Sequence, residues 1–223
     1  MRRSAPLGWG RPAALLVVAV LSGLTACSDG SNQGSASSGS PLAVGQDKAL
    51  SARLLDDADL ASLAGARTNP IQDLSLYRDP DPRTPCGGRA PALDFSAGAG
   101  VGIQAPTATG VELLAPLAPD AAKAYVAAFV ADAHVGCAPF DSTTNTGTHQ
   151  SATLLAAVPL DGVGDSSLAF VTSITNASGT AIATHVLVAR NGTVAVLLML
   201  GGQPLSADVS RALGQRIDSR LAS

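Results

Sequence analysis

The sequence predicts an α+β fold in which helices flank a central antiparallel sheet, all within a single domain. Its second half contains four segments with alternating apolar side chains, and the last two flank Asn191-Gly192, a strong signal for a two-residue β-hairpin. Two other segments, residues 119–135 and 206–221, carry apolar side chains at helical spacing. Strands joined by hairpins pair antiparallel, and amphipathic helices bury their apolar stripes against such a sheet.

The first part of the domain combines helical and irregular patterns. Residues 47–65 carry leucines near helical spacing and end at a glycine, so they are predicted as a helix. Asn69-Pro70 is expected to break the chain, and residues 71–77 are predicted as a short strand. Residues 78–91 are rich in proline and glycine and are expected to form a loop that contains Cys86.

The remaining elements follow the helical and the alternating period in turn. The helix at residues 119–135 begins beside prolines that suit a helix start, and Gly136 ends it, which places Cys137 just beyond the helix. The last helix begins at Ser206, a favourable N-cap. Strands are predicted at residues 99–105, 109–115, 150–158, 168–175, 181–190 and 193–200.

The N-terminus has the parts of an export signal. Basic residues precede an apolar run at residues 13–24, which is shorter than the roughly 20 residues that a membrane span needs. Leu24-Thr25-Ala26-Cys27 resembles the bacterial lipobox, which implies cleavage before Cys27 and lipid on its sulfur. We therefore expect a signal peptide at residues 1–26 and a Ser/Gly-rich tether at 27–44. The alternatives are a membrane-anchor helix and a chance cysteine near an ordinary cleavage site.

The other two cysteines, Cys86 and Cys137, form one pair once Cys27 is lipidated. In an oxidising compartment this pair predicts a disulfide. The bridge closes a loop of about 50 residues, which the chain-entropy relation values at about 4 kcal/mol. Two free thiols are the alternative, and the absence of a CxxC spacing argues against a metal site.

The charge balance disfavours nucleic acid as a partner. Without residues 1–26 the chain has 14 − 3 = 11 basic and 17 acidic side chains, a net charge of about −6. Only Lys48 and Lys123 are lysines, so no basic patch offsets this charge. Asp47, Asp56, Asp57 and Asp59 lie on the first predicted helix and are interpreted as its solvated face.

Catalytic and metal-binding patterns are weak. The histidines His134, His149 and His185 lie more than four residues apart, which is unlike a metal site. His134 lies near the end of the predicted helix and is assigned to the C-terminal helix dipole. His185 is expected opposite Leu198 on the buried face of the hairpin, as a core histidine or as a perturbed histidine at a cleft. No GxSxG motif occurs, so we expect neither an enzyme nor a cofactor.

Several features occur in an order that resembles a known family. After the lipobox and tether come LLDDADL at residues 54–60, a cysteine in a Pro/Gly loop, a helix leading to Cys137, the turn Gly164-Asp165, the strand end at 188–192 and an amphipathic C-terminal helix. This order is similar to sensor-domain lipoproteins of high-GC Gram-positive bacteria, related to the extracellular sensor domain of a mycobacterial serine/threonine protein kinase, the PknH-like family.

The resemblance implies a central antiparallel sheet, a cleft for an unidentified ligand and no enzymatic activity. By position, Cys86 and Cys137 match a bridge of the family, although the kinase sensor has two bridges and this chain has one pair. No ligand-binding residue can be carried over. We expect a lipid-anchored, extracytoplasmic domain over residues 45–223 that binds a small ligand or an envelope protein. The alternative is a structural or protein-interaction module of the cell envelope without a small ligand, and a cryptic hydrolase is the third hypothesis.

Overall fold

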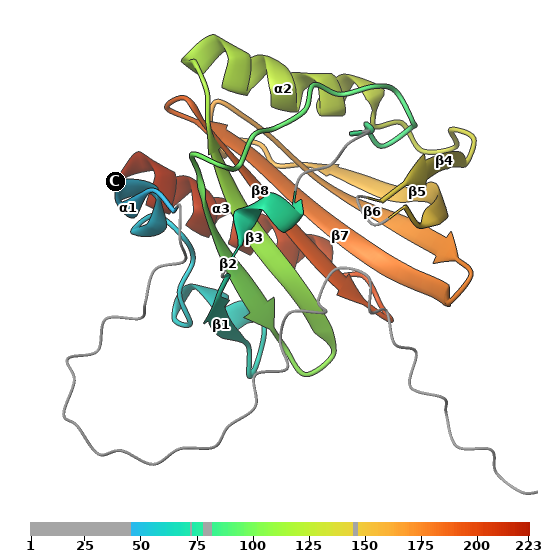
Figure 1. Cartoon of the computed structure of the whole chain (residues 1–223), viewed down its shortest axis with the longest axis horizontal. Helices are drawn as coiled ribbons and strands as arrows, with labels where there is room; N and C mark the ends of the chain where they lie inside the picture. Colours follow the sequence, from blue (N-terminus) through green and yellow to red (C-terminus); the bar gives the residue numbers. More distant parts are fainter. Residues whose placement is uncertain (1–45, 72, 78–81, 145–146) are drawn as a thin grey trace, which may run out of the picture.

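The computed structural model of the chain describes residues 46–71, 73–77, 82–144 and 147–223. Within these residues one antiparallel sheet runs in the spatial order β1-β2-β3-β8-β7-β6-β5-β4, with helices on both faces (Figure 1). This confirms the predicted α+β class. The strands are β1 Arg67–Pro70, β2 Ala99–Gln104, β3 Ala108–Pro116, β4 Phe140–Thr143, β5 His149–Pro159, β6 Ser166–Asn176, β7 Gly179–Arg190 and β8 Thr193–Gly201; the helices are α1 Lys48–Ser51, α2 Pro119–Asp132 and α3 Ala207–Ala222, with 3₁₀ turns η1 Asp59–Ser62 and η2 Leu74–Tyr77.

The hairpin between β7 and β8 forms as its sequence predicts. Asn191 and Gly192 have φ values of 49° and 74°, the left-handed conformations that a type I′ turn requires at both central positions. This turn sets the register of the two strands, with Arg190 opposite Thr193 and His185 opposite Leu198. The central strand pair of the sheet, β7 with β8, is therefore specified by local sequence.

Side-chain alternation along β7 divides the core into two layers. Val186 and Val188 belong to one buried cluster with α3, whereas Leu187 and Ala189 belong to another cluster with α2. We name these the α3-side face and the α2-side face. The helices contribute Leu213, Ile217 and Leu221 to the α3-side core and Ala122, Tyr125, Val126 and Phe129 to the α2-side core.

The predicted helix at residues 47–65 is wrong. Only Lys48–Ser51 and the short turn Asp59–Ser62 are helical. The Asp56 carboxylate accepts the backbone N–H groups of Ala58 and Asp59 at 2.9 and 3.1 Å, so a local turn competes with the helix. The N–H of Leu55 bonds to the side chain of Glu112 on β3 at 2.8 Å.

Two neighbouring predictions are also wrong. The strand expected at residues 71–77 is replaced by the 3₁₀ turn η2, and β1 forms one segment earlier, through Asn69-Pro70, where a break was expected. Because β1 is an edge strand, Pro70 can lie in it without removing a ladder hydrogen bond from the sheet interior. At the other edge, β4 was not predicted at all.

Candidate functional site

The predicted lipid-bearing residue Cys27 lies outside the described residues, as do the predicted signal peptide at 1–26 and the tether at 27–44. Their roles therefore stay predictions. In the part of the chain that is described, no helix combines the length and the apolar character that crossing a membrane would take.

Cys86 and Cys137 are joined in a disulfide, the pair that the sequence predicts. Their Cα atoms are 5.6 Å apart, a usual separation for a bridge. The bond links the loop before β2 to the segment that follows α2. The irregular loop is thereby fixed to the end of a helix that is itself packed on the sheet.

The surroundings of the disulfide include a carboxylate and an imidazole. Asp132, the last residue of α2, accepts the N–H of Cys86 at 2.8 Å and the hydroxyl proton of buried Thr84. The Nδ1 atom of exposed His134 lies 3.7 Å from the Cys86 sulfur. A disulfide sulfur has no proton to donate, so the contact of 3.4 Å between this sulfur and the His134 carbonyl is van der Waals packing. His134 lies close to the helix end, as predicted, but α2 stops at Asp132, before His134, and the ring of His134 lies beside the disulfide.

His185 lies on the α2-side face, where β7 runs beside β6. Its ring stacks on Phe170 with centroids 4.3 Å apart and planes 6° apart. Its Nε2 atom is 3.2 Å from the hydroxyl of buried Thr172. Burial lowers the pKa of His185 to about 4, so the imidazole is neutral at physiological pH although part of the residue keeps solvent contact.

The strand face around His185 is less completely covered than the part beneath α2. Val196 and Leu198 on β8 are only half-buried, whereas Val194 on the same strand is fully buried. Helix α2 contacts β6, β7 and β8, and it lies across one end of the sheet (Figure 1). Half-buried apolar side chains around a neutral histidine–threonine pair have the composition of a site for a mostly apolar ligand with a few polar groups.

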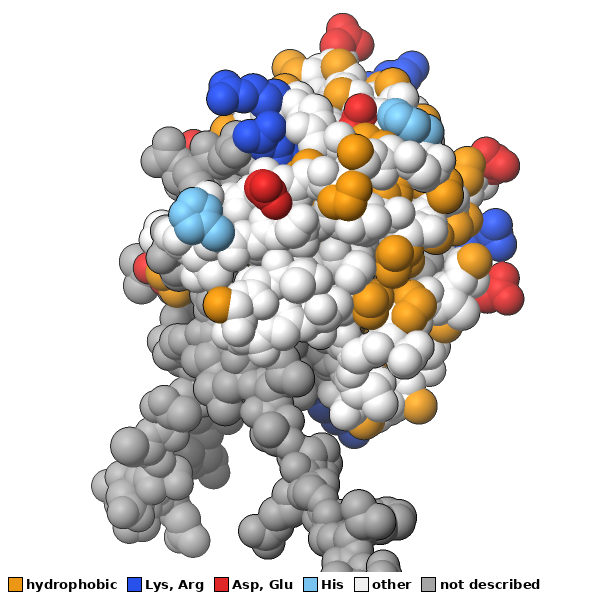
Figure 2. Space-filling model, turned by 90° about the vertical axis from the view of Figure 1, so that its right-hand side faces the viewer, with side chains coloured by type: hydrophobic (Ala, Val, Ile, Leu, Met, Phe, Trp, Pro, Cys, Tyr) orange, Lys and Arg blue, Asp and Glu red, His pale blue; other side chains and the backbone are white. Residues whose placement is uncertain are grey.

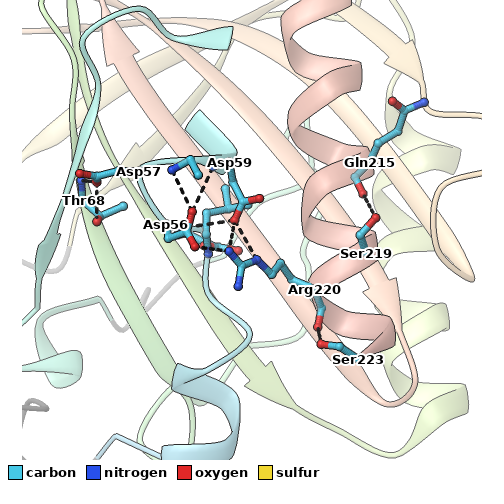
Figure 3. Close-up of polar contacts among 11 residues, drawn as sticks. Asp56, Asp57, Asp59, Thr68, Gln215, Ser219, Arg220 and Ser223 are labelled. Carbon is cyan, nitrogen blue, oxygen red and sulfur yellow. Dashed lines mark hydrogen bonds and ion pairs between the residues drawn. The ribbon is translucent and has the colours of Figure 1, made fainter. Parts of the chain in front are cut away.

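The α3-side face carries a second polar cluster, which closes the N-terminal segment onto the last helix (Figure 3). Arg220 on α3 forms ion pairs with Asp56 and Asp59, and its Nε atom lies 2.8 Å from Asp59 Oδ2. Asp57 accepts the N–H and the hydroxyl proton of Thr68 at 2.7 and 2.8 Å. The predicted long helix does not form, so these aspartates are not a helix face. Asp56 and Asp57 are exposed, as a solvated face requires, but both also have partners outside their own turn.

Asp47, the remaining member of that group, also has a structural role. Its side chain caps α1 by accepting the N–H of Leu50 at 2.8 Å. Asp47 is exposed, as predicted, but it caps a helix of four residues and not the long helix that was predicted.

Glu112 on β3 lies beneath this cluster and is fully buried. One carboxyl oxygen accepts the N–H of Leu55 at 2.8 Å, and the other, Oε1, is buried without a hydrogen-bond partner. Burial raises the pKa of Glu112 to about 8, so the side chain is mostly protonated at pH 7. Glu112 was not predicted as a site residue. Its position as the lone acidic residue within the apolar strand at 109–115 is the sequence feature that could have indicated a buried carboxyl group.

Comparison with known proteins identifies the fold. No family model and no curated protein sequence matches the chain. Among solved structures, the chain is similar to the extracellular domain of PknH from Mycobacterium tuberculosis, with a TM-score of 0.52 and 14% sequence identity. The similarity covers 79% of this chain and 96% of that domain. The chain therefore has a PknH-like extracellular-domain fold, in agreement with the fold that the sequence order implied.

Proposed function

We propose that this chain is a lipoprotein anchored at the extracytoplasmic face of the cell membrane, whose domain at residues 45–223 is a non-enzymatic, sensor-like ligand-binding module. The observation that carries the proposal is the match to 96% of an extracellular domain. Two further features support it. The N-terminal sequence has the pattern of an export signal that ends just before Cys27. Cys86 and Cys137 form a bridge of the kind that persists in oxidising compartments.

The anchoring part of the proposal rests on acyl chains at Cys27. Each buried CH₂ group contributes about 0.8 kcal/mol, so two or more chains hold a domain at a membrane without a spanning helix. Replacing Cys27 with Ala is expected to release the protein from the membrane fraction into the medium, while Cys86 and Cys137 stay bridged. Retention of the Cys27→Ala protein in washed membranes would contradict the anchor.

The ligand-binding part concerns the α2-side face around His185 and Thr172. These two side chains are the polar pair within a patch whose other members, such as Val196 and Leu198, are apolar and half-buried. A neutral imidazole offers one donor and one acceptor, which orients a ligand without requiring a charge. The proposed ligand class is therefore a predominantly apolar molecule with one or two polar groups.

Native mass spectrometry of the full chain, extracted from membranes in mild detergent, tests ligand binding. A retained molecule is expected on the wild type, and its occupancy should fall at least about tenfold in Thr172→Val, which deletes one polar contact while conserving shape. Thr184→Val is the matched control, since Thr184 lies on the α3-side face and accepts the N–H of Leu205 at 3.0 Å. Equal retention in both variants would move the site elsewhere, and no retained molecule on the wild type would contradict binding.

The histidine–threonine pair does not favour a hydrolase. A hydroxyl 3.2 Å from an imidazole has the distance of a nucleophile and its base. However, a base with a pKa of about 4 takes up a proton weakly at neutral pH. Thr172 is also buried in the middle of β6, opposite Ala183 and Leu154, and not on an exposed turn.

A second candidate, an envelope protein-interaction module, is favoured by the outer surface near α2. Val130 on α2 is 44% exposed, and Val135, three residues after the helix, is 70% exposed. Figure 2 shows further apolar side chains gathered on one side of the molecule, with most charged side chains toward the edges of the view. Cross-linking on whole cells distinguishes the candidates, because a Val130→Lys, Val135→Lys variant should lose a protein adduct and keep a bound small molecule.

A further inference from the structure

The structure brings Cys86 together with two potential metal ligands that lie much later in the chain, His134 at 48 residues and Cys137 at 51 residues from it. The sulfurs of Cys86 and Cys137 and a ring nitrogen of His134 all lie within 4.8 Å of one another. They come from the loop before β2 and from the turn after α2. No metal site was predicted from the sequence, because the approach of Cys86 to His134 joins residues 48 positions apart.

We propose that reduction of the Cys86–Cys137 disulfide converts this cluster into a Cys₂His site for a thiophilic divalent cation such as Zn²⁺. A disulfide sulfur is a poor ligand, whereas a thiolate binds Zn²⁺ strongly. The disulfide and the metal are therefore alternative cross-links at one place, selected by the redox state. This inference concerns chemistry at the disulfide and does not depend on the ligand proposed at His185.

Distances in the oxidised protein are already close to those of a tetrahedral site. With Zn–S of about 2.3 Å and Zn–N of about 2.0 Å, a sulfur and a nitrogen on one zinc ion are roughly 3.5 Å apart, and two sulfurs roughly 3.8 Å. The His134 Nδ1 atom is 3.7 Å from the Cys86 sulfur. The cysteine sulfurs must separate by roughly 1.7 Å beyond their bonding distance, which side-chain rotation provides once the bond is broken.

The backbone around the cluster is held by contacts that do not need the disulfide. Asp132 accepts the N–H of Cys86 and the hydroxyl proton of Thr84. Gly136 has a φ of 96°, which turns the chain back after α2, and the Cys137 N–H bonds to the His134 carbonyl at 3.4 Å. The ligand positions are thus kept near one another in the reduced protein, as a metal site requires.

The site is reachable from solvent and keeps one coordination position free. His134 is exposed, and the two cysteines are half-buried. Two thiolates and one neutral imidazole supply three ligands, so a water molecule completes the tetrahedron. No ion needs to enter the core, and the acidic chain as a whole favours the approach of a cation.

The reaction balances with a dithiol as reductant. One thiolate of the dithiol attacks a sulfur of the Cys86–Cys137 bond to give a mixed disulfide, and its second thiol then closes the dithiol into its own disulfide. Two electrons pass to the protein, which leaves two cysteine thiols. Binding of Zn²⁺ then displaces one proton from each thiol and releases two protons to solvent.

The test is a metal titration of the full chain. The protein is reduced with a dithiol, freed of reductant without oxygen, and titrated with Zn²⁺ against a chromophoric chelator; Co²⁺ then reports thiolate ligation through its charge-transfer absorption. We expect one equivalent bound by the reduced wild type, none at that affinity by the oxidised protein, and an affinity at least about tenfold lower in His134→Ala. His149→Ala is the matched control, because His149 is exposed on β5 beside Thr143 and should bind as wild type does.

A thermal readout covers the case of altered folding. Zn²⁺ should raise the Tm of the reduced wild type and of reduced His149→Ala, but raise that of reduced His134→Ala much less. The inference is overturned if the reduced wild type binds Zn²⁺ no more tightly than the oxidised protein. It is also overturned if His134→Ala binds as tightly as the wild type, since two thiols alone then explain the binding.

Discussion

Each face of the sheet holds an ionisable side chain whose neutral form is favoured by burial, Glu112 on one face and His185 on the other, but the two faces hold it differently. On the α3-side face, Glu112 is fully enclosed and one of its oxygens has no hydrogen-bond partner. On the α2-side face, His185 stacks on Phe170, bonds to Thr172 and keeps some contact with solvent. The first arrangement closes a segment onto the core, whereas the second pairs the imidazole with a hydroxyl on the neighbouring strand.

The comparison of Glu112 with His185 shows that a perturbed pKa does not by itself mark a functional site. Glu112 is raised to about 8 and His185 is lowered to about 4, both mainly by burial. His185 shares its face with the half-buried Val196 and Leu198, whereas Glu112 bonds to Leu55 and lies near the ion pairs of Arg220. The exposure and the neighbours of each side chain therefore assign a structural role to Glu112 and make His185 the candidate ligand contact.

The largest expected effect comes from removing the bridge on the α2 side. The double replacement Cys86→Ser, Cys137→Ser should lower the free energy of unfolding by about 4 kcal/mol, because the unfolded chain regains the freedom of a loop spanning 51 residues. Urea denaturation of the oxidised wild type and the double variant measures the difference. Equal midpoints would show that the contacts of Asp132 alone fix the loop.

The next effect tests Glu112 on the α3 side. Its folded pKa of about 8 exceeds its unfolded value of 4.5, so its contribution is complete below pH 4.5 and is lost as pH rises toward 8. Glu112→Gln cannot ionise and should therefore be more stable than the wild type by up to about 3 kcal/mol at pH 7. Denaturation across pH 4.5–8 should show a falling stability for the wild type relative to the variant. A constant difference across that range would contradict the assignment.

His185 should show the opposite dependence on pH. Its folded pKa of about 4 lies below the unfolded value of 6.5, so its contribution is complete above pH 6.5 and is lost as pH falls toward 4. His185→Leu should match the wild type within about 1 kcal/mol at pH 7 and exceed it by up to about 2 kcal/mol at pH 5. Partial solvent contact makes this an upper figure. Nuclear magnetic resonance titration of the imidazole gives an independent check, and a pKa near 6.5 would refute the burial argument.

The smallest effect concerns Arg220, which joins α3 to the N-terminal segment. Arg220→Ala removes the ion pairs with Asp56 and Asp59, and because these groups are partly exposed the loss should be about 1 kcal/mol. Amide hydrogen exchange should rise mainly in residues 54–62. Arg211→Ala is the control, since its ion pair with Asp208 is exposed and within one helix. Similar exchange in both variants would mean that apolar packing alone holds the segment.

The sequence allowed prediction where the determinants of structure are local. The turn at Asn191-Gly192 and the cap at Ser206 depend on neighbouring residues, and both form as expected. The helix at 47–65 does not form, because the Asp56 side chain makes a local turn and the N–H of Leu55 has its partner at Glu112, 57 residues away. Short edge strands such as β4 carry too few alternating residues to be recognised.

The candidate sites show the same limit. The Cys86–Cys137 pair followed from counting cysteines, and the position of His185 followed from the hairpin register. The approach of His134 to Cys86 depends on how α2 ends beside a loop 48 residues earlier, which no periodicity encodes. Neighbours of this kind become visible only once the sheet and its helices are assembled.

Lipid anchoring at Cys27 is tested most directly by the mass of the protein extracted from membranes, followed by non-reducing peptide mapping. We expect a mature chain that begins at Cys27 with acyl chains attached, and a single cross-linked peptide joining Cys86 to Cys137. An unprocessed chain that retains residues 1–26, with all three cysteines free, would contradict it.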